Sequence, residues 1–449
     1  MTWTQKVTLE QIREHIAQGE TVALLRLFDD LQGADIAEIV SLLDEGERTS
    51  VFRNLSPDDS ARVFEHLDYR LQSQLLVSLG PDRAREILGD MFSDDLADLV
   101  GELNPGQADE VLSLMEDADA EEIRDLLSYP ETSAGGIMTT ELVKLDHRKS
   151  VDDAIKSIRA DAEHLESVYY VYVTKDGKLV GVVTLRQLII ASPAAKLKDI
   201  MEDNVVSVRA EVDQEEVARL LSKYDFIAMP VVDSHNRLLG MVTIDDVLDV
   251  LSDEATEDIS KFGGTLPLDE PYLTASVYSM FKKRIGWLLV LFVAQAFTSV
   301  IMKSYEVVLG SFVSLAFFIP LLIDTGGNAG SQAATLVIRG MAVGEVNIKH
   351  AAKVFFKEMR VGLLLGAVMG VVTYGRALMM GESAALALTV TITIVSIILM
   401  AVLMGSILPM ILKRLKLDPA VVSGPFITTF VDTLGLLIYF VVAAHLLGI

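Results

Sequence analysis

One acidic side chain lies inside the last hydrophobic segment of this chain. Asp432 stands among apolar residues in the stretch 419–444. A carboxylate near the middle of a membrane helix costs roughly 2.5–3.5 kcal/mol on insertion scales, so such residues usually face a water-filled path or an ion. Thr428 precedes Asp432 by four residues and therefore shares its helix face. The pattern indicates an ion-binding position, and a structural hydrogen bond between helices is the alternative.

A second hydrophobic segment, 307–338, contains a glycine-rich polar stretch. Pro320 is followed by DTGGNAGSQ at 324–332, which begins with Asp324. Irregular backbone at membrane depth is tolerated only where it lines protein or a water-filled cavity. We therefore expect a break in this helix, whose free carbonyls and Asn328 side chain suit a hard cation. Close packing of small residues between helices is the alternative.

An acidic segment precedes the first hydrophobic span. Residues 243–264 are expected to form a helix that ends near the glycine pair 263–264. Its acidic residues recur at four-residue spacing in one series, Asp245, Asp249, Asp253 and Glu257. A second series contains Asp246, Glu254 and Asp258, with Val250 at the intervening position. Like charges at this spacing destabilise a helix by roughly 0.2–0.5 kcal/mol per pair, so bound divalent cations would stabilise it. A solvated acidic face is the alternative.

Charge is distributed unequally along the 449 residues, a length sufficient for two or three domains. Residues 1–262 carry 25 basic and 54 acidic side chains, whereas residues 263–449 carry 13 and 9. This balance argues against nucleic acid as a partner and favours cations. Since there is no cysteine, disulfides and thiolate metal sites are excluded. Residues 1–16 lack the apolar core of a signal peptide, so we expect residues 1–260 to remain in the cytoplasm.

A short repeat occupies residues 1–130. Apolar residues recur every 12 positions, at Leu31, Leu43, Leu55, Leu67, Leu79, Met91, Leu103 and Met115. Ser56-Pro57 and Asn104-Pro105 read as helix starts, with a capping residue before a proline. Each piece is too short to bury its apolar face alone, so stacked pieces are expected to form an acidic helical solenoid. It is either a structural spacer or a regulatory arm that binds cations.

The next part of the chain is a tandem duplication. KLVGVVTLRQLI at 178–189 recurs as RLLGMVTIDDVL at 237–248. Each copy is expected to form strand, helix, strand, turn, strand and helix. The two copies resemble a pair of CBS domains, which we assign to 131–199 and 200–252.

The CBS resemblance implies adenine-nucleotide binding. The second copy ends in Gly240, Thr243 and Asp246, and the resemblance implies that the Asp binds the ribose. In the first copy Gln187 replaces the acid. At most one well-equipped nucleotide site is therefore expected.

The remaining residues, 271–449, are expected to form a membrane domain. Five spans are predicted, near 285–303, 307–338, 353–377, 384–412 and 419–446. Basic residues gather before the first span, between the second and third, and between the fourth and fifth. The positive-inside rule then gives a cytoplasmic N-terminus and an external C-terminus.

Together these units resemble the MgtE family of magnesium channels over nearly the whole chain. The most specific residues are Pro320 with 326–332, the AGGIMT segment at 134–139, and Asp418-Pro419 with Asp432 and Gly435. The resemblance implies a multidomain membrane protein. Its parts would be an all-α superhelical N domain, an α/β tandem CBS pair, a linker (plug) helix at 245–270 and an α-helical transmembrane domain of five helices.

The resemblance also implies site residues and partners. It implies a homodimer in a bacterial inner membrane, with a pore lined by Asp432, Thr428, Gly327 and Asn328, whereas Asp324 is a departure that adds a carboxylate. Regulatory Mg²⁺ would bind to Asp94, Asp95, Asp213, Glu215, Asp225, Asp246, Asp249, Glu254, Glu257 and Asp258. ATP would bind near Arg186, Phe226 and Asp246.

These observations lead to one hypothesis and two alternatives. The hypothesis is a Mg²⁺-selective channel for magnesium uptake that cytosolic Mg²⁺ closes. The first alternative is a transporter of another divalent cation, such as Co²⁺, Mn²⁺ or Zn²⁺. The second is a CBS-based nucleotide or cation sensor on a membrane anchor. An enzyme is not expected, because no nucleophile–base grouping and no Walker A pattern is found.

Overall fold

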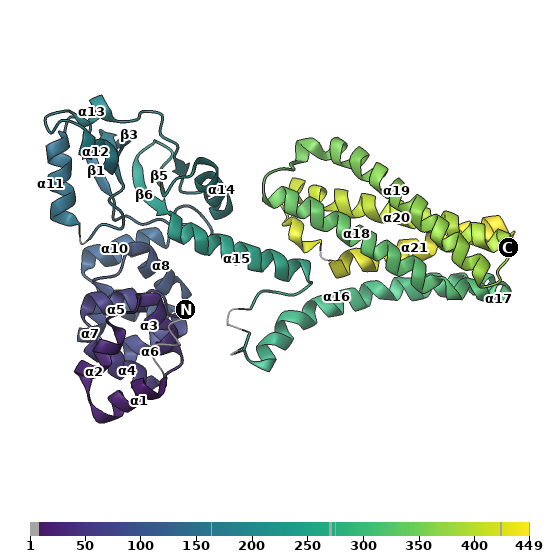
Figure 1. Ribbon diagram of the computed structural model, residues 1–449, viewed down its shortest axis with the longest axis horizontal. Helices are drawn as coiled ribbons and strands as arrows, with labels where there is room; N and C mark the ends of the chain where they lie inside the picture. Colours follow the sequence, from purple (N-terminus) through teal and green to yellow (C-terminus); the bar gives the residue numbers. More distant parts are fainter. Residues whose placement is uncertain (1–8, 163, 269–271, 274, 423, 449) are drawn as a thin grey trace. The chain divides into compact units, whose positions relative to one another are not determined.

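The computed structural model describes residues 9–162, 164–268, 272–273, 275–422 and 424–448 (Figure 1). The chain forms two compact units, Met1–Leu251 and Ser252–Ile449. Each unit has its own hydrophobic core.

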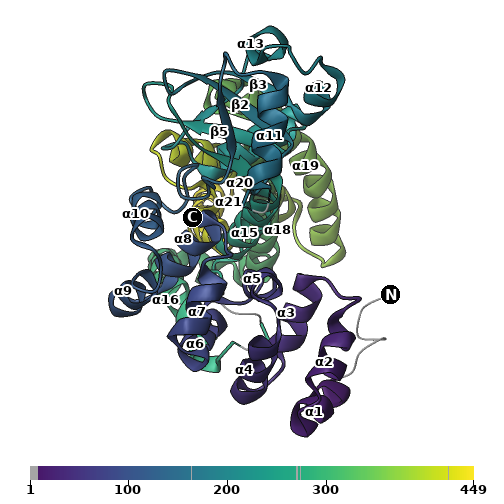
Figure 2. The same cartoon turned by 90° about the vertical axis from the view of Figure 1, so that its left-hand side faces the viewer.

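The first unit begins with a series of short helices, shown in Figure 2. They are α1 (Leu9–Gln18), α2 (Thr21–Phe28), α3 (Gly33–Ser41), α4 (Glu45–Asn54), α5 (Pro57–Phe64), α6 (Tyr69–Leu79), α7 (Pro81–Leu88), α8 (Ser93–Glu102), α9 (Pro105–Leu112) and α10 (Asp117–Leu126). The two helix starts predicted from sequence are confirmed, because Ser56 and Asn104 accept hydrogen bonds from the backbone N–H groups of Asp59 and Gln107.

The 12-residue repeat supplies the core of these helices. Leu43, Leu55, Leu67, Leu79 and Met91 are buried. Leu31, Leu103 and Met115 are partly buried against the same core. Helices of 8 to 11 residues are marginal alone, so their stability comes from stacking on neighbouring helices.

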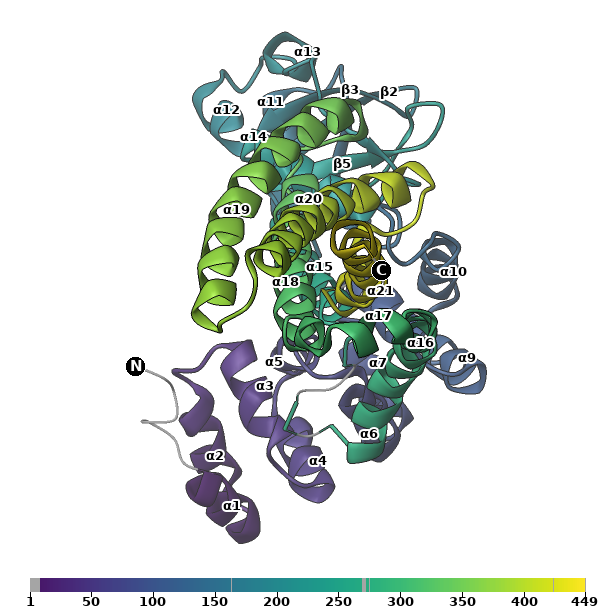
Figure 3. The same ribbon diagram turned by 90° about the vertical axis from the view of Figure 1, so that its right-hand side faces the viewer.

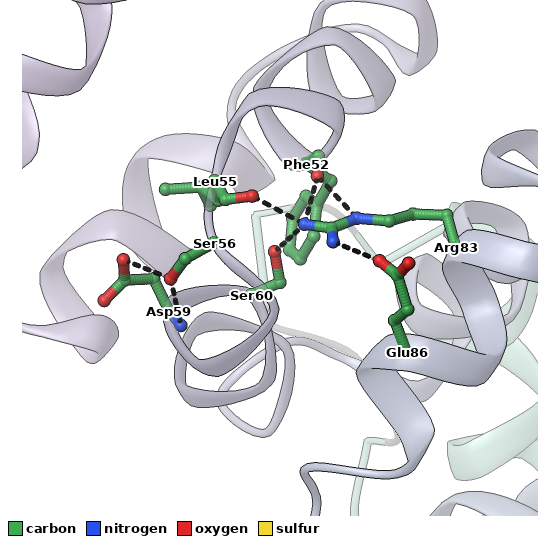
Figure 4. Close-up of polar contacts among 7 residues, drawn as sticks. All are labelled: Phe52, Leu55, Ser56, Asp59, Ser60, Arg83 and Glu86. Atoms are coloured by element: carbon green, nitrogen blue, oxygen red, sulfur yellow. Dashed lines mark hydrogen bonds and ion pairs between the residues drawn. The ribbon is translucent and has the colours of Figure 1, made fainter.

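Arg83 joins adjacent repeats by hydrogen bonds to carbonyl groups at the end of a helix (Figure 4). Its Nη2 donates to the carbonyl oxygens of Phe52 and Leu55 at 3.1 and 2.6 Å. It also donates to Ser60 Oγ at 2.9 Å, while Nη1 pairs with Glu86 at 2.7 Å. The last carbonyls of a helix have no partner within it, so Arg83 stabilises the end of α4 from α7.

Two small sheets of the same topology follow. The first copy contains β1 (Val143–Asp146), α11 (Val151–Asp161), β2 (Tyr170–Lys175), β3 (Lys178–Thr184) and α12 (Leu185–Ile190), and α13 (Leu197–Ile200) connects the copies. The second contains β4 (Val208–Arg209), α14 (Gln214–Tyr224), β5 (Ala228–Val232), β6 (Leu238–Thr243) and α15 (Ile244–Phe262). In each sheet the first strand is parallel to the second, which pairs with the third as an antiparallel hairpin. The predicted order of elements in both copies is confirmed.

The second unit is a helical bundle, seen along another direction in Figure 3. Its elements are α16 (Val277–Ser304), α17 (Glu306–Ser311), η2 (Val313–Phe317), α18 (Ile319–Ala342), η3 (Ile348–His350), α19 (Ala351–Met379), α20 (Ala384–Arg414), η4 (Pro419–Val421) and α21 (Gly424–Leu447). Five helices among the described residues are long and apolar enough to cross a membrane. In the most hydrophobic 18-residue stretch of α20, 56% is buried inside the protein, whereas in that of α16 only 6% is buried. Helix α20 is therefore the central helix and α16 is peripheral.

Several predicted element boundaries differ from the structure. The predicted second span is divided at Phe312 and Phe318, on either side of a short 3₁₀ helix. The predicted fifth span starts too early, because Pro419 begins a separate 3₁₀ turn and α21 begins at Gly424. The linker helix ends at Phe262, which confirms the predicted end near the glycine pair 263–264, because the chain turns at Gly264 with a φ of +72°. The linker bounds of 245–270 therefore extend too far. The sequence Ser423-Gly424-Pro425 also predicts a break in the fifth span, but Ser423 lies outside the described residues.

Candidate functional site

Asp432 lies on α21, where two polar contacts join this helix to α16. Gln295 Nε2 donates a hydrogen bond to Asp432 Oδ2 at 3.4 Å. The hydroxyls of Thr298 and Thr433 are 3.0 Å apart. Gln295 and Thr298 are three residues apart and so share a helix face. Both interact with consecutive residues of α21, so α16 approaches the candidate ion-binding carboxylate through polar side chains.

The glycine-rich stretch of α18 is a continuous helix, so the predicted break there is wrong. Residues 319–342 are helical throughout, and the carbonyls of residues 324–332 therefore lie within a helical hydrogen-bond pattern. A Cβ added at Gly326 would lie 2.4 Å from Ile397 Cγ2, and one at Gly330 would lie 2.8 Å from Ile427 Cγ2. The glycines thus allow α18 to pack closely against α20 and α21, which agrees with the alternative reading of close packing.

Close packing at Gly327 brings α18 against the face of α21 that carries Thr428 and Asp432. A Cβ at Gly327 would lie 2.9 Å from Thr428 Cγ2, one turn before Asp432. One turn before Asn328, Asp324 Oδ2 accepts a hydrogen bond from Asn328 Nδ2 at 3.3 Å. The Asp324 carboxylate is near enough to Asp432 for their charges to interact. The five residues predicted from sequence for the pore therefore lie in neighbouring turns of α18 and α21.

Gln295 was not predicted from the sequence. The signal was present, because it is one of few polar residues between Ile285 and Met302. The Gln295 side chain is exposed in the single chain. The nearby hydrophobic residues Leu288, Phe292 and Val293 are exposed as well. An amide in such a helix needs a polar partner or water.

A second group of acidic residues gathers in the first unit, around the start of α8 and the start of α15. Asp94, on α8, is buried with 7% of its surface exposed. Burial, followed by the charges of Asp246 and Asp95, raises the pKa of Asp94 well above its usual range. Burial is also the main cause that raises the pKa of Asp95 to about 7 and that of Asp246 to about 6. Three predicted regulatory residues are therefore close together.

Further carboxylates of this group, Glu65 and Glu166 among them, were missed by sequence reasoning. Burial, together with the charge of Asp245, raises the pKa of Glu65 to about 7 and that of Glu166 to about 8. Glu166 Oε2 is buried and has no hydrogen-bond partner among the residues that the structure describes. We call Glu65, Asp94, Asp95, Glu166 and Asp246 the acidic cluster. Its members repel one another when ionised, so a cation among them would be stabilising.

Glu141 fixes the position of α8 against the first residues of the CBS pair. Its Oε2 accepts hydrogen bonds from Ser93 Oγ and Thr139 Oγ1, both at 2.7 Å. Ser93 immediately precedes Asp94, so this network holds the cluster in place. Asp249 is close enough to Asp246 for its charge to raise the pKa of that residue, whereas two other predicted carboxylates of this unit lie at the ends of α14. Asp213 caps the start of α14 and Asp225 ends it in the left-handed region.

Within the described part of the chain, no group of three or more His, Cys, Asp or Glu side chains has the arrangement of a preformed metal site. The predicted regulatory carboxylates, including Glu215 and Asp249, therefore do not form a complete site within one chain. Any cation held there would need water or a second chain for its remaining ligands.

Lys261, near the end of α15, forms ion pairs within the second unit. Lys261 Nζ is 2.6 Å from Asp418 Oδ2 and also pairs with Glu257. Burial, followed by the charges of Asp418 and Glu254, raises the pKa of Asp258. Gly264 follows with no space for a side chain, because an added Cβ would lie 2.5 Å from Trp287 Cδ1. Three predicted regulatory carboxylates, Glu254, Glu257 and Asp258, thus lie on the part of α15 that ends beside α21.

The predicted nucleotide residues have local structural roles. Asp246 accepts hydrogen bonds from Thr243, and Gln187 accepts equivalent bonds from Thr184 at 2.7 and 2.9 Å. Replacing the acid by Gln187 therefore keeps the helix cap in the first copy. Phe226 stacks on Tyr224, with ring centroids 5.5 Å apart. No hydrogen bond or ion pair joins Arg186 to Asp246 among the residues that the structure describes.

Comparison with known protein families supports this architecture. The MgtE family, described as a divalent cation transporter, matches residues 319–442. The MgtE intracellular N domain family matches residues 31–132. The CBS domain matches residues 134–194 and 197–253. The fold and these matches define a multi-pass membrane protein that carries a CBS pair and falls in the class of divalent cation transporters.

Similar proteins cover most of the chain. Magnesium transporter MgtE from Thermus thermophilus is 43% identical over 335 residues, which are 74% of each chain. Magnesium transporter MgtE from Bacillus subtilis is 38% identical over 332 residues, which are 74% of this chain and 73% of that one. The chain belongs to the MgtE family.

Two solved structures resemble the non-membrane part. A crystal structure of the soluble part of a magnesium transporter is 35% identical, with a TM-score of 0.52, and covers 55% of this chain and 98% of that one. A crystal structure of the cytosolic domain of the Mg²⁺ channel MgtE in complex with ATP is 37% identical, with a TM-score of 0.52, and covers 54% and 100%.

Proposed function

We propose that this protein carries Mg²⁺ across a bacterial inner membrane, with Asp432 as its main ion-binding side chain. The observation that carries the proposal is an ionisable side chain within a helix long and apolar enough to cross a membrane, surrounded by Gln295, Thr428 and Asp324. A carboxylate at that depth is retained where it serves an ion or proton path. The magnesium transporters among its relatives support Mg²⁺ as the ion.

A two-fold symmetric homodimer would place two copies of Asp432 on one axis. Two like carboxylates in a poorly solvated pore repel each other unless a cation lies between them. Mg²⁺ dehydrates reluctantly, so it would pass with several of its waters held by the two carboxylates. Inward flow needs no fuel, because two charges that cross 100 mV gain roughly 4.6 kcal/mol.

Metal competition in proteoliposomes tests the choice of ion. The full-length chain should take up Mg²⁺, and Co²⁺, Mn²⁺ or Zn²⁺ should compete for the same path. Oxygen ligands without cysteine favour the harder ions. Uptake of Co²⁺ with no uptake of Mg²⁺ would establish the other-cation alternative. No flux of any divalent cation would favour a sensor on a membrane anchor.

Regulation by Mg²⁺ on the domain side is the second part of the proposal. At low Mg²⁺, ionised carboxylates of the acidic cluster repel one another and the cytosolic part loosens. Bound Mg²⁺ would offset this repulsion and draw the helices together, and α15 would transmit the change to the pore. The buried Glu166 Oε2, which has no hydrogen-bond partner among the described residues, supports a cation-binding role for this cluster.

Limited proteolysis tests this regulation. Cleavage of α15 and the following turn, between Ser252 and Gly264, should slow as Mg²⁺ rises into the millimolar range. NaCl at the same ionic strength is the control, because it screens surface charges to the same extent as the magnesium salt. If screening alone protected the linker, NaCl would slow cleavage equally. Cleavage at one rate for all Mg²⁺ concentrations would contradict the proposed regulation.

ATP binding to the CBS pair is a secondary proposal, supported by the ATP-bound relative. Arg186, Phe226 and Asp246 are the candidate contacts. The carboxylates beside Asp246 would repel phosphate groups, so the ribose end of the nucleotide would lie toward them. Calorimetric titration of the full-length protein with ATP, compared with Asp246→Asn, tests the assignment.

The positive-inside rule supports the proposed orientation. Lys282, Lys283 and Arg284 lie in the first turns of α16, and Lys413 and Arg414 end α20. The soluble unit and the N-terminus would then be cytoplasmic. A cysteine introduced at an exposed residue of the first unit should be inaccessible to an impermeant thiol reagent in intact cells.

A further inference from the structure

We propose that Gln295 is a specificity-determining residue of the ion path, through its hydrogen bond to Asp432. The inference rests on the proposed transport function. It assigns to α16 a part in ion recognition, although α16 is otherwise the most lightly packed of the candidate spans among the described residues.

The surroundings of Gln295 suggest a role beyond helix packing. It lies in a charge-free run from Ile285 to Met302, and its side chain is exposed. An exposed amide in a lipid-facing helix would leave two N–H donors and a carbonyl without partners. The described contact of the amide is Asp432 Oδ2, at 3.4 Å. Gln295 therefore faces the same polar path as the ion-binding carboxylate.

The hydrogen bond has a chemical consequence for ion selection. It occupies one carboxylate oxygen and restrains rotation of the Asp432 side chain. A restrained carboxylate can accept hydrogen bonds from the waters of a hydrated ion but is poorly able to turn and ligate the ion directly. Ca²⁺ accepts flexible direct coordination by carboxylates, whereas Mg²⁺ tends to keep its waters. The amide of Gln295 should therefore favour Mg²⁺ over Ca²⁺.

The competing explanation is that Gln295 only holds α16 against α21. Thr298 provides the matched control, because its hydroxyl makes the neighbouring contact between the same two helices, with Thr433 at 3.0 Å. Thr298→Val removes that contact and leaves Asp432 untouched. A purely structural role predicts the same behaviour for substitutions at both positions.

The experiment measures initial influx of Mg²⁺ and of Ca²⁺ separately in proteoliposomes that contain the full-length chain. Gln295→Met keeps side-chain length and removes the donors, and Gln295→Asn keeps an amide that is too short to reach. Both should raise the ratio of Ca²⁺ to Mg²⁺ influx by about tenfold, a change that one hydrogen bond to a charged group is large enough to produce. Thr298→Val should leave the ratio unchanged.

Several results would overturn the inference. It is wrong if the influx ratio in both Gln295 variants equals that of the wild type. It is also wrong if Thr298→Val shifts the ratio as much as they do, because helix packing would then explain the effect. If the wild type carries no Mg²⁺ at all, the proposed function itself fails, which the same assay distinguishes from a failure of selectivity.

Discussion

At the scale of single residues, the acidic cluster is the feature with the clearest physical consequence. Burial and mutual repulsion raise the pKa of Glu65 and Asp95 to about 7 and that of Glu166 to about 8. Asp95 and Glu65 come from different helices of the solenoid, whereas Glu166 comes from the first CBS copy. Ionisation of these carboxylates should therefore weaken the packing between the solenoid and the first CBS copy.

The raised pKa values predict a stability that depends on pH. Because they exceed the unfolded values near 4, the folded state binds more protons than the unfolded chain between roughly pH 4 and pH 8. The free energy of unfolding should therefore fall as pH rises through that window in the absence of divalent cations. Millimolar Mg²⁺ should restore the stability at pH 8. Thermal unfolding of the full-length protein, followed at several pH values with and without Mg²⁺, measures both effects.

Asp94→Asn should make the free energy of unfolding depend less on pH and also respond less to Mg²⁺. It should stabilise the Mg²⁺-free protein at pH 8 by about 1.4 kcal/mol for each pKa unit of repulsion that it relieves. Asp82→Asn is the matched control, because the side chain of Asp82 is 99% exposed and should contribute little. A larger effect at Asp82 than at Asp94 would contradict the assignment of the cluster.

At the scale of elements, the packing of α18 depends on glycines. A Cβ at Gly405, on α20, would lie 2.1 Å from the Gly330 carbonyl oxygen, so the two helices touch through their backbones. We expect Gly330→Val to cost about 1–3 kcal/mol by overpacking and to lower the unfolding temperature in detergent. Gly375→Val on α19 is the control, because an added Cβ there would meet no described atom within 4 Å. Equal losses at both positions would argue against close packing as the role of Gly330.

The pairing of Lys261 with Asp418 gives the linker helix α15 an attachment that needs no metal. A partly exposed ion pair contributes about 0.2–1 kcal/mol. Lys261→Gln should therefore raise the Mg²⁺ concentration needed to close the channel by up to about fivefold, since 1.4 kcal/mol corresponds to a factor of ten. Lys261→Arg keeps the charge and should behave like the wild type. An unchanged threshold in Lys261→Gln flux assays would show that the pair has no part in closure.

Sequence patterns predicted the elements well where local chemistry determines them. The helix starts at Ser56 and Asn104 depend on a capping side chain and a following proline, and both are local. The glycine-rich stretch of α18 was misread because its conformation depends on Ile397 and Val431, which are distant in sequence. Glu65 and Glu166 were missed for the same reason, since only the tertiary fold brings them to Asp94.

At the scale of the whole molecule, the proposal links two chemically similar sets of carboxylates in one chain. One set lies in the acidic first unit, and the other is Asp432 with Asp324 in the helical bundle. Both sets would bind the transported ion. The concentration of Mg²⁺ on the side of the first unit would therefore regulate its own transport. Such feedback requires only that bound Mg²⁺ stabilises one arrangement of the first unit more than another.

The most direct test is Mg²⁺ influx into proteoliposomes that contain the wild-type chain or Asp432→Asn. The substitution keeps the size of the side chain and removes its charge, so we expect influx to fall at least about tenfold because Mg²⁺ loses its main anionic partner. Glu345→Gln, at an exposed position between α18 and η3, removes an equal charge and should keep wild-type influx. Wild-type influx in Asp432→Asn would contradict the assignment of Asp432 as the ion-binding residue.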